Sequence, residues 1–265
     1  MKNSLINISN QDNGILRLTL DDENNKNALS EAMIGELTEA INAANNNKEV
    51  KVIIIASNGN VFCSGHNLKE ITAARNNNDK GESYFMNLFE LCSSLMQLIV
   101  SCSKPVIAEV DGIATAAGCQ LVASCDLAIS SSTAKFATPG VNIGLFCSTP
   151  MVALSRNVSK KEAMKMLLTG DMIDAVEAKR ISLINDYVSD DKLEESVNNL
   201  ALKISKKSSM TVKIGKEAFY KQAEMSLSDA YAYTSVVMAQ NTLNDDAKEG
   251  ISSFIEKRDP NWQDN

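Results

Sequence analysis

The sequence predicts an α/β fold with a helical C-terminal region. In the first 150 residues, apolar strand-like runs alternate with segments of helical periodicity. After Pro150 the strand-like runs nearly vanish and helical patterns follow one another. Because no abrupt linker separates the two parts, we expect residues 1–200 to form the core and residues 201–265 a helical region of the same structural unit.

The first predicted elements are a strand, a helix and a second strand. Residues 15–20 (ILRLTL) alternate apolar and polar side chains, which is typical of a strand. Ser30 is placed to cap a helix with one apolar face. Residues 50–56 (VKVIIIA) are rich in β-branched side chains and predict a buried strand. A long helix with an apolar stripe is expected over residues 83–101.

The central stretch, residues 104–150, predicts a site for an anion. A buried strand over residues 105–110 is followed by a turn at Gly112 and by a helix over residues 115–125 that opens on small side chains. A short strand then follows over residues 127–130. The N-terminus of a helix directs free N–H groups and the positive end of its dipole outward, and an anion can bind there.

The rest of the chain is predicted to be mostly helical. The FCSTP stretch fits a helix start, with Thr149 as cap and Pro150 in the first turn. One late strand is expected over residues 183–188. Further helices are expected over residues 190–206, 210–222, 226–241 and 245–257.

Composition excludes several classes of function. The net charge of -7 and the absence of a basic run argue against a nucleic-acid partner. The six cysteines form no C-x-x-C pair and the chain has one histidine, so we expect no zinc or other metal site. We expect six reduced and mostly buried thiols.

The ends and the hydropathy of the chain lead us to expect a cytoplasmic protein with no membrane partner. No apolar run approaches the roughly 20 residues that span a bilayer. The N-terminal stretch MKNSLINISNQDNG lacks a signal-peptide core and an Arg-rich amphipathic pattern. The C-terminal stretch NWQDN carries no targeting tail.

Two stretches place backbone N–H groups where negative charge could develop. One is the loop of residues 64–67 (SGHN), and the other is the predicted helix start at residues 116–118 (AAG). Two converging N–H donors would form an oxyanion hole for an enolate or a tetrahedral intermediate, and one such donor contributes about 3 kcal/mol. A tight packing joint between helix and strand would use the same small residues, so both interpretations stay open.

Several motifs resemble a known family over nearly the whole chain. The sequence is similar to the enoyl-CoA hydratase/isomerase (crotonase) superfamily, and most similar to its hydratase-domain-containing subgroup, which carries SGHDLKE and a TPGVNVGLFCSTP-type loop. The motifs that carry the resemblance are VFCSGHNLKEI (61–71), KPVIAEVDGIATAAGCQLVASCDLAI (104–129), FATPGVNIGLFCSTP (136–150) and LLTGDMIDAVEAKRISLINDYV (167–188).

The resemblance implies a ClpP/crotonase spiral of repeated ββα units whose residues 201–265 assemble a homotrimer or a dimer of trimers. It also implies that acyl-CoA thioesters bind, in fatty-acid or acyl-CoA metabolism. The thioester oxygen would lie between the backbone N–H groups of His66 and Ala117. The family usually has glycine at the second of these positions, and alanine fits there if its φ is negative. No cofactor is implied other than the coenzyme A of the substrate.

Further residues are implied at the CoA site. Lys69 matches a family lysine near the CoA moiety, and Ser64, Leu68 and Gly118 belong to the same motifs. In the C-terminal region, Phe254 and Lys257 resemble residues that help to close the CoA site, in some members from a neighbouring subunit.

The chain departs from the family at the two glutamates of the hydratases. One is replaced by Gln120 and the other by Gly140, so both carboxylates are missing. Losing a general acid or base costs about 10²- to 10⁴-fold in rate. We therefore expect little ordinary hydration. Restoring glutamate at both positions is expected to create some hydratase activity.

Other side chains could substitute for the missing carboxylates. His66 has the chemistry of a base, although its side chain could instead pack against the CoA. Cys147 should border the pocket, where it could equally be an inert small residue. Glu109 is expected to face a subunit interface or a neighbouring strand, Asp111 to hold the turn, and Asp126 to be structural.

Three functions remain open, in this order of preference. The first is an acyl-CoA enzyme that needs the oxyanion hole but not the glutamates, such as an isomerase, a decarboxylase or a thioester hydrolase. The second is a non-catalytic acyl-CoA-binding or regulatory protein. The third is a serine hydrolase of the Clp-protease type, which ranks last because the one histidine lies in the oxyanion loop.

Overall fold

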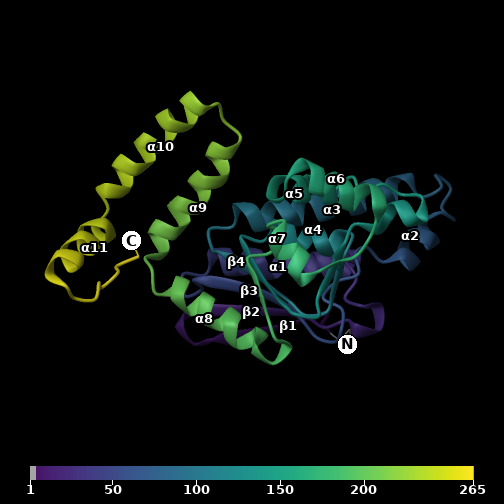
Figure 1. Ribbon diagram of the computed structural model, residues 1–265, viewed down its shortest axis with the longest axis horizontal. Coiled ribbons are helices and arrows are strands. Elements are labelled where there is room, and N and C mark those ends of the chain that lie inside the picture. Colours follow the sequence, from purple (N-terminus) through teal and green to yellow (C-terminus); the bar gives the residue numbers. More distant parts are fainter. Residues whose placement is uncertain (1–3, 265) are drawn as a thin grey trace.

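The computed structural model describes residues 4–264, and its larger sheet has six strands in the order β1-β2-β3-β4-β6-β9 (Figure 1). β1 pairs with β2 in antiparallel orientation, and the other neighbours are parallel. The strands are β1 (Ile6–Gln11), β2 (Ile15–Leu20), β3 (Val52–Ser57), β4 (Val106–Val110), β6 (Leu127–Ser131) and β9 (Asp186–Val188). The ends of the two expected regions, residues 1–3 and 265, lie outside the described residues.

A second, smaller sheet lies beyond the end of β4. It has the order β5-β7-β8, with β5 and β7 parallel and β7 and β8 antiparallel. Its strands are β5 (Ile113–Thr115), β7 (Lys135–Ala137) and β8 (Ile173–Asp174). This small sheet leads directly into the helix of the predicted anion site.

Helices cover both faces of the larger sheet. They are α1 (Glu31–Asn46), α2 (Leu68–Ala74), α3 (Glu82–Ser101), α4 (Ala117–Ser124), α5 (Pro150–Asn157), α6 (Lys160–Thr169), α7 (Ala175–Arg180), α8 (Leu193–Ser205), α9 (Ser209–Ala223), α10 (Leu227–Thr242) and α11 (Asp245–Glu256). In β3, Ile53 and Ile55 face the core that contains α1 and α3, whereas Val52 and Ile54 face α8. This alternation explains why residues 52–55 are apolar without a break, since a strand buried on both faces has no polar side.

The structure confirms the long predicted elements and adds short ones. Helices expected around α1, α3, α4 and α8 to α11 are present, as are the strands β2, β3, β4 and β6. The sequence did not indicate the short β5, β7 and β8, because two or three residues are too few to establish a period. The late strand is confined to β9. Thr149 does not cap α5 with its side chain, although α5 does begin at Pro150.

Within residues 4–264, α3 is the one helix that is long and apolar enough to cross a membrane by length and composition. This corrects the expectation that no run approaches that length. The apolar character of α3 is explained by its buried stripe, which belongs to the core shared with α1: Leu88, Cys92, Leu95, Met96 and Ile99. As evidence for a membrane span, the helix is therefore weak.

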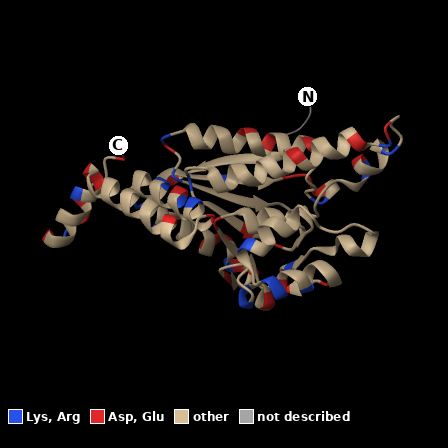
Figure 2. Cartoon of the chain, turned by 90° about the horizontal axis from the view of Figure 1, so that it is seen from above, with Lys and Arg blue, Asp and Glu red and all other residues tan. Residues whose placement is uncertain are grey.

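The C-terminal helices α9, α10 and α11 extend away from the sheet (Figure 1). None of the residues of α10 is buried, and a groove of about 430 Å³ lies between α9 and α10. Large apolar side chains are exposed along these helices: Phe219, Leu227, Tyr231, Val236, Met238, Leu243, Ile251, Phe254 and Ile255. Figure 2 shows basic and acidic residues interspersed over the chain. The one charged side chain of α10 is Asp229.

A buried ion pair anchors the C-terminal helices to the core. Lys216 of α9 donates through Nζ to Asp126 Oδ2 at 2.7 Å and to the carbonyl oxygens of Ile99 at 2.9 Å and Lys104 at 3.0 Å. The hydroxyl of Tyr220 donates to the other carboxylate oxygen of Asp126 at 2.9 Å. All three ammonium hydrogens thus have acceptors, so the buried charge is compensated. The structural role expected for Asp126 is confirmed.

A second buried pair explains Glu109. Its carboxylate accepts two hydrogen bonds from the guanidinium of Arg17, at 2.7 and 2.8 Å, and both side chains are about one-tenth exposed. Arg17 also donates to Asn198 Oδ1 of α8 at 3.0 Å. Glu109 therefore faces other elements of its own chain, and its carboxylate is held in a fixed bidentate pair.

We predict that Lys216→Met lowers the free energy of unfolding by about 3 kcal/mol, because it leaves the Asp126 carboxylate buried with its countercharge removed. Tyr220→Phe removes one hydrogen bond to the same carboxylate and should cost about 1 kcal/mol. Urea unfolding followed by circular dichroism measures both. A loss below 1 kcal/mol for Lys216→Met would contradict the anchoring role.

Candidate functional site

Hydrogen bonds place the 64–67 loop beside the start of α4. The Cys63 N–H donates to the Ile113 carbonyl at 3.1 Å, and the Thr115 N–H donates to the Cys63 carbonyl at 2.9 Å. The Thr115 hydroxyl donates to the Ser64 carbonyl at 3.2 Å. The chain segment that leads into the loop is therefore paired with β5, the strand that leads into α4.

Two glycines allow the closest approach at this joint. A Cβ on Gly118 would lie 2.1 Å from the Cys63 carbonyl oxygen, so only glycine fits there. A Cβ on Gly65, where φ is +91°, would lie 3.3 Å from the amide nitrogen of Ala117. The loop that carries His66 is thus in contact with the first residue of α4. The packing interpretation and the oxyanion interpretation describe the same joint.

The two amides expected to hold an oxyanion are free at this joint. Among residues 4–264, neither the His66 N–H nor the Ala117 N–H donates to a backbone acceptor. Ala117 is the first residue of α4, where the helix leaves its N–H groups without intrahelical partners. The structure therefore brings together the two stretches that the sequence singled out, with both donors unused.

Backbone strain falls on Ala116, the residue before the second donor. Ala116 has φ 51° and ψ -119°, a region that glycine favours and that costs an alanine on the order of 1–3 kcal/mol. Ala117 is absent from the residues with positive φ, so alanine is tolerated there as expected. A hydrogen bond of 2.9 Å from the Ala116 N–H to the Ala137 carbonyl holds the turn against β7.

The side chain of His66 is half-buried and packs against Phe89. Its Nδ1 lies 3.2 Å from the Leu29 carbonyl, which can only accept, so Nδ1 carries the hydrogen. The ring packs edge-on against Phe89 with 5.4 Å between centroids. Burial lowers the pKa of His66, and its Nε2 is buried without a partner among the described residues.

At the first replaced glutamate, the structure holds a buried amide. Gln120 lies one turn into α4 and is 4% exposed, and its Oε1 has no hydrogen-bond partner among the described residues. Thr138, just after β7, is 1% exposed, and its hydroxyl also lacks a partner there. The sequence reasoning did not single out Thr138. Its place in the segment that ends at the second lost glutamate was the available signal.

At the second replaced glutamate, Gly140, residues of the following loop fill the space that a side chain would need. A Cβ on Gly140 would lie 2.6 Å from the Leu145 carbonyl oxygen and 2.9 Å from the Cys147 sulfur. The Leu145 N–H donates to the Gly140 carbonyl at 2.9 Å, which fixes this fold of the loop. Restoring glutamate at Gly140 therefore requires the loop to move, and the expectation that the double restoration creates activity stays a prediction.

The cysteines are free and buried. Burial raises the pKa of Cys63 and of Cys119 to about 12, and it also raises the pKa of the Cys147 thiol. A thiol whose pKa is raised in this way forms little thiolate, which supports the inert interpretation of Cys147. Among residues 4–264, no three metal-ligating side chains of His, Cys, Asp or Glu come together.

The expected CoA contacts separate into two groups. Ser64, Leu68, Lys69 and Gly118 lie at the joint or on α2, whose first turn is capped by the Asn67 side chain through a 3.0 Å bond to the Lys69 N–H. Leu68 and Lys69 are exposed. In contrast, Phe254 and Lys257 lie at the end of α11, and Figure 1 shows α2 and α11 at opposite ends of the molecule. Within one chain these two residues are not part of the site.

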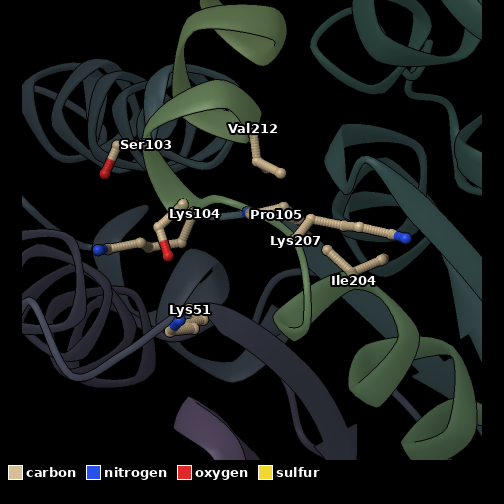
Figure 3. A pocket seen from close by; sticks show the side chains of 8 residues that line it. Lys51, Ser103, Lys104, Pro105, Ile204, Lys207 and Val212 are labelled. Atoms are coloured by element: carbon tan, nitrogen blue, oxygen red, sulfur yellow. The ribbon is translucent and has the colours of Figure 1, made fainter. Parts of the chain in front are cut away.

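A small cavity at the other end of the strands is not part of this site. It measures about 10 Å³, which holds about one water molecule, and it lies where β3 and β4 begin (Figure 3). Some of its polar groups have partners, whereas the Ser209 hydroxyl is buried without one among the described residues. Lys51 pairs with Asp264 at 2.9 Å, and Asp264 accepts the Ser209 N–H at 2.6 Å. The contacts of Asp264 with Lys51 and Ser209 hold the C-terminal tail beside this cavity.

We predict that Gly140→Ala lowers the free energy of unfolding by about 1–3 kcal/mol, because the added methyl meets the Leu145 carbonyl. The matched control is Gly35→Ala in α1, where an added Cβ has nothing within 4 Å and should stabilise the helix by about 1 kcal/mol. Urea unfolding measures both. If Gly140→Ala proves neutral, the loop yields easily and a glutamate could be accommodated.

We also predict that His66 titrates below its ordinary pKa of about 6.5, because burial disfavours the charged ring. The unfolded chain then binds the proton first, so the contribution of His66 to stability is full above pH 6.5 and is lost as the pH falls below that value. Since the chain has one histidine, its NMR signal in the folded protein gives the pKa directly. A midpoint at or above 6.5 would contradict this environment.

Comparison with known proteins agrees with these motifs. Residues 10–265 match the family model for enoyl-CoA hydratase/isomerase. A relative from Xenopus laevis, "Enoyl-CoA hydratase domain-containing protein 3, mitochondrial", is 47% identical over 99% of this chain and 87% of its own. The human protein of the same name is 45% identical over 94% of this chain and 80% of its own.

Solved structures show the same fold. The crystal structure of human enoyl coenzyme A hydratase domain-containing protein 3 matches with a TM-score of 0.92 and 44% identity, covering 97% of this chain and 100% of that chain. An enoyl-CoA hydratase from Mycobacterium smegmatis matches with a TM-score of 0.93 and 43% identity, over 97% and 98% of the two chains.

These relatives contradict the expected cytoplasmic location. Five of them, between 43% and 47% identical to this chain, carry "mitochondrial" in their names. The expectation depended on sorting patterns that the chain did not display, and a missing pattern excludes nothing.

Fold, motifs and relatives thus lead to one family. The predicted α/β crotonase fold with a helical C-terminal region is confirmed, and so is the likeness to the hydratase-domain-containing subgroup. The chain belongs to the enoyl-CoA hydratase/isomerase (crotonase) family.

Proposed function

We propose that this protein binds acyl-CoA thioesters and stabilises an enolate-type anion at the thioester oxygen, and that it does not carry out ordinary hydration. The observation that carries this proposal is the pair of unused N–H groups of His66 and Ala117 at a single joint. The two positions that hold acid and base in the hydratases are occupied by Gln120 and Gly140.

The joint has the properties that stabilise developing negative charge. Both donors belong to the backbone, and their positions are fixed by the pairing of Cys63 with β5 and by the contact of Gly65 with Ala117. The Ala117 amide also lies at the positive end of the α4 dipole. Donors fixed in advance need no reorganisation during the reaction, and each contributes about 3 kcal/mol to the anionic state.

Ordinary hydration lacks its acid and its base. A neutral amide such as Gln120 can hold a water molecule but cannot remove its proton, and Gly140 offers no side chain. Reactions that pass through an anion at the thioester oxygen without these carboxylates remain compatible with the site. They include isomerisation, decarboxylation and thioester hydrolysis, within acyl-CoA or fatty-acid metabolism.

The second candidate is a non-catalytic acyl-CoA-binding or regulatory protein. It is favoured by the weakness of the available bases, because burial lowers the pKa of His66 and raises the pKa of the Cys147 thiol. The same bond of His66 disfavours a serine hydrolase, in which the ring would be oriented by an acidic side chain.

Assembly would complete the CoA site. We propose a homotrimer or a dimer of trimers in which the C-terminal helices meet neighbouring subunits. The exposed apolar side chains of α9 to α11 support such an interface, because contiguous apolar surface of this kind marks contact sites. Lys69 would contact the CoA from its own chain, whereas Phe254 and Lys257 would reach it from a neighbour.

Calorimetry and absorbance together test the proposal. We expect butyryl-CoA to bind in titration calorimetry, and we expect the conjugated absorbance of crotonyl-CoA to remain constant over minutes. Each missing carboxylate should slow hydration by about 10²- to 10⁴-fold. Hydration at ordinary enzyme rates would contradict the proposed loss of chemistry, and failure to bind any CoA thioester would overturn both candidates.

Exchange of the C2 hydrogens of bound butyryl-CoA with deuterated water separates the enzyme from the binder. An anion stabilised at the thioester oxygen makes these hydrogens acidic, so that solvent water takes the C2 proton and returns deuterium, and we expect mass spectrometry to show deuterium at C2. Free butyryl-CoA under the same conditions is the control. Binding without exchange above this control would favour the regulatory protein.

A further inference from the structure

The turn after β3 contains one of the two Asn-Gly dipeptides of the chain. Asn58 and Gly59 directly follow β3, and Asn13 and Gly14 lie between β1 and β2. In such a dipeptide the backbone nitrogen of the glycine can attack the carboxamide of the asparagine, because glycine has no Cβ in the way of ring closure. Both asparagines are exposed, so access to water is the same at the two places. The difference between them lies in their hydrogen bonds.

The nitrogen that would attack is free at Gly59 and engaged at Gly14. Among residues 4–264, the Gly59 N–H donates to no backbone acceptor, and residues 58–60 form an open bend. Gly14, in contrast, is the last residue of the 3-10 helix Asp12–Gly14, and N–H groups in such a helix bond to carbonyls three residues earlier. The Gly14 carbonyl also accepts the Lys51 N–H at 2.7 Å. Reaction at Asn13 must therefore break a hydrogen bond that is absent at Asn58.

A buried carboxamide, that of Asn27, stabilises the charge that the attack creates. Its Nδ2 donates to the Asn58 carbonyl at 2.9 Å and to the Val61 carbonyl at 2.8 Å, and its Oδ1 accepts the Asp22 N–H at 2.8 Å. Asn27 is 1% exposed, so this donor is fixed in place. When Gly59 loses its amide proton, resonance across the peptide bond carries negative charge to the Asn58 carbonyl oxygen. A fixed donor at that oxygen makes the Gly59 nitrogen easier to ionise.

We propose that Asn58 is a site of spontaneous deamidation, with the backbone nitrogen of Gly59 as the nucleophile. This modification goes beyond the proposed function and does not depend on it.

The reaction needs only water. The Gly59 nitrogen gives its proton to hydroxide and forms a bond with Cγ of Asn58. The Cγ–Nδ2 bond breaks, and the amide group leaves as ammonia after taking a proton from water. A further water molecule then opens the cyclic imide at one of its two C–N bonds, which leaves aspartate or isoaspartate at this position. The sum is one water consumed and one ammonia released, without an oxidant or a cofactor.

The product disturbs the turn in which it forms. The Asn58 side chain donates to Asp21 Oδ1 at 2.9 Å, and a carboxylate in its place cannot donate and repels Asp21. Glu23 is a further carboxylate nearby, since its Oε2 lies 2.9 Å from the place that a Cβ on Gly59 would take. Isoaspartate in addition lengthens the main chain between β3 and the 64–67 loop. Deamidation therefore weakens the turn that leads to this loop.

Ageing the full-length protein in a mildly alkaline buffer tests the site. Digestion and mass spectrometry give the fraction of each asparagine that has become an acid, and chromatography separates aspartate from isoaspartate. In the folded protein we expect Asn58 to react about tenfold faster than Asn13, because its glycine has no hydrogen bond to break and the Asn27 donor assists. In guanidinium chloride both turns unfold, and the two rates should become similar. Asn58→Gln is the matched control, because its longer side chain closes a larger and less favoured ring.

Stability shows the consequence of the modification. Asn58→Asp should lower the unfolding midpoint in urea, because the new carboxylate faces Asp21. Asn60→Asp is the matched comparison, since it adds the same charge in the same exposed turn without replacing the hydrogen bond to Asp21. We expect it to lower the midpoint by less.

Three results would overturn the inference. Equal rates at Asn13 and Asn58 in the folded protein would show that the hydrogen bonds do not select the site. An Asn58 that stays intact in the folded protein while the denatured protein reacts would show that the turn protects it. Equal midpoints for Asn58→Asp and Asn60→Asp would remove the consequence at Asp21. None of these measurements involves a CoA thioester, so each leaves the proposed function standing.

Discussion

The pairing of Cys63 with strand β5 is the interaction on which the rest of the site depends. Two hydrogen bonds, at 3.1 and 2.9 Å, join chain segments about 50 residues apart and bring one oxyanion loop beside the helix that carries the other. Gly118 lets α4 lie against the same carbonyl, and the strained turn at Ala116 directly precedes Ala117, the first residue of α4. The strained conformation is maintained by the hydrogen bonds on either side of it, from the Thr115 N–H to the Cys63 carbonyl and from the Ala116 N–H to the Ala137 carbonyl.

The same joint explains how the chain keeps the fold of the family while it lacks the acid and base side chains of the hydratases. The two backbone N–H donors are positioned by the same contacts that pack the loop against α4. Losing these contacts would therefore disrupt the packing of the core. The acid and base were side chains, and side chains can change without loss of the fold. At Gly140 the loss of the side chain is accompanied by a different use of the space, since Leu145 and Cys147 occupy the place where the Cβ of a glutamate would lie. At Gln120 the polar character remains without the charge.

The sequence alone predicted most of the long elements and both stretches of the site, because these depend on local patterns, but it did not indicate β1 or α6. Ser30 caps α1 as expected, and the apolar run in β3 is buried on both faces. What the sequence could not supply were contacts between distant residues. Asp126 is paired with Lys216, 90 positions away. At Gly140, Leu145 and Cys147 fill the space beside the Cα. No periodicity or composition encodes such partners.

A crystal structure with bound butyryl-CoA tests the central claim most directly, namely that the two backbone amides hold the thioester oxygen although the carboxylates are gone. We predict that this oxygen lies about 2.7–3.1 Å from the amide nitrogens of both His66 and Ala117. A thioester oxygen that contacts neither amide, with the acyl chain elsewhere on the surface, would contradict the account.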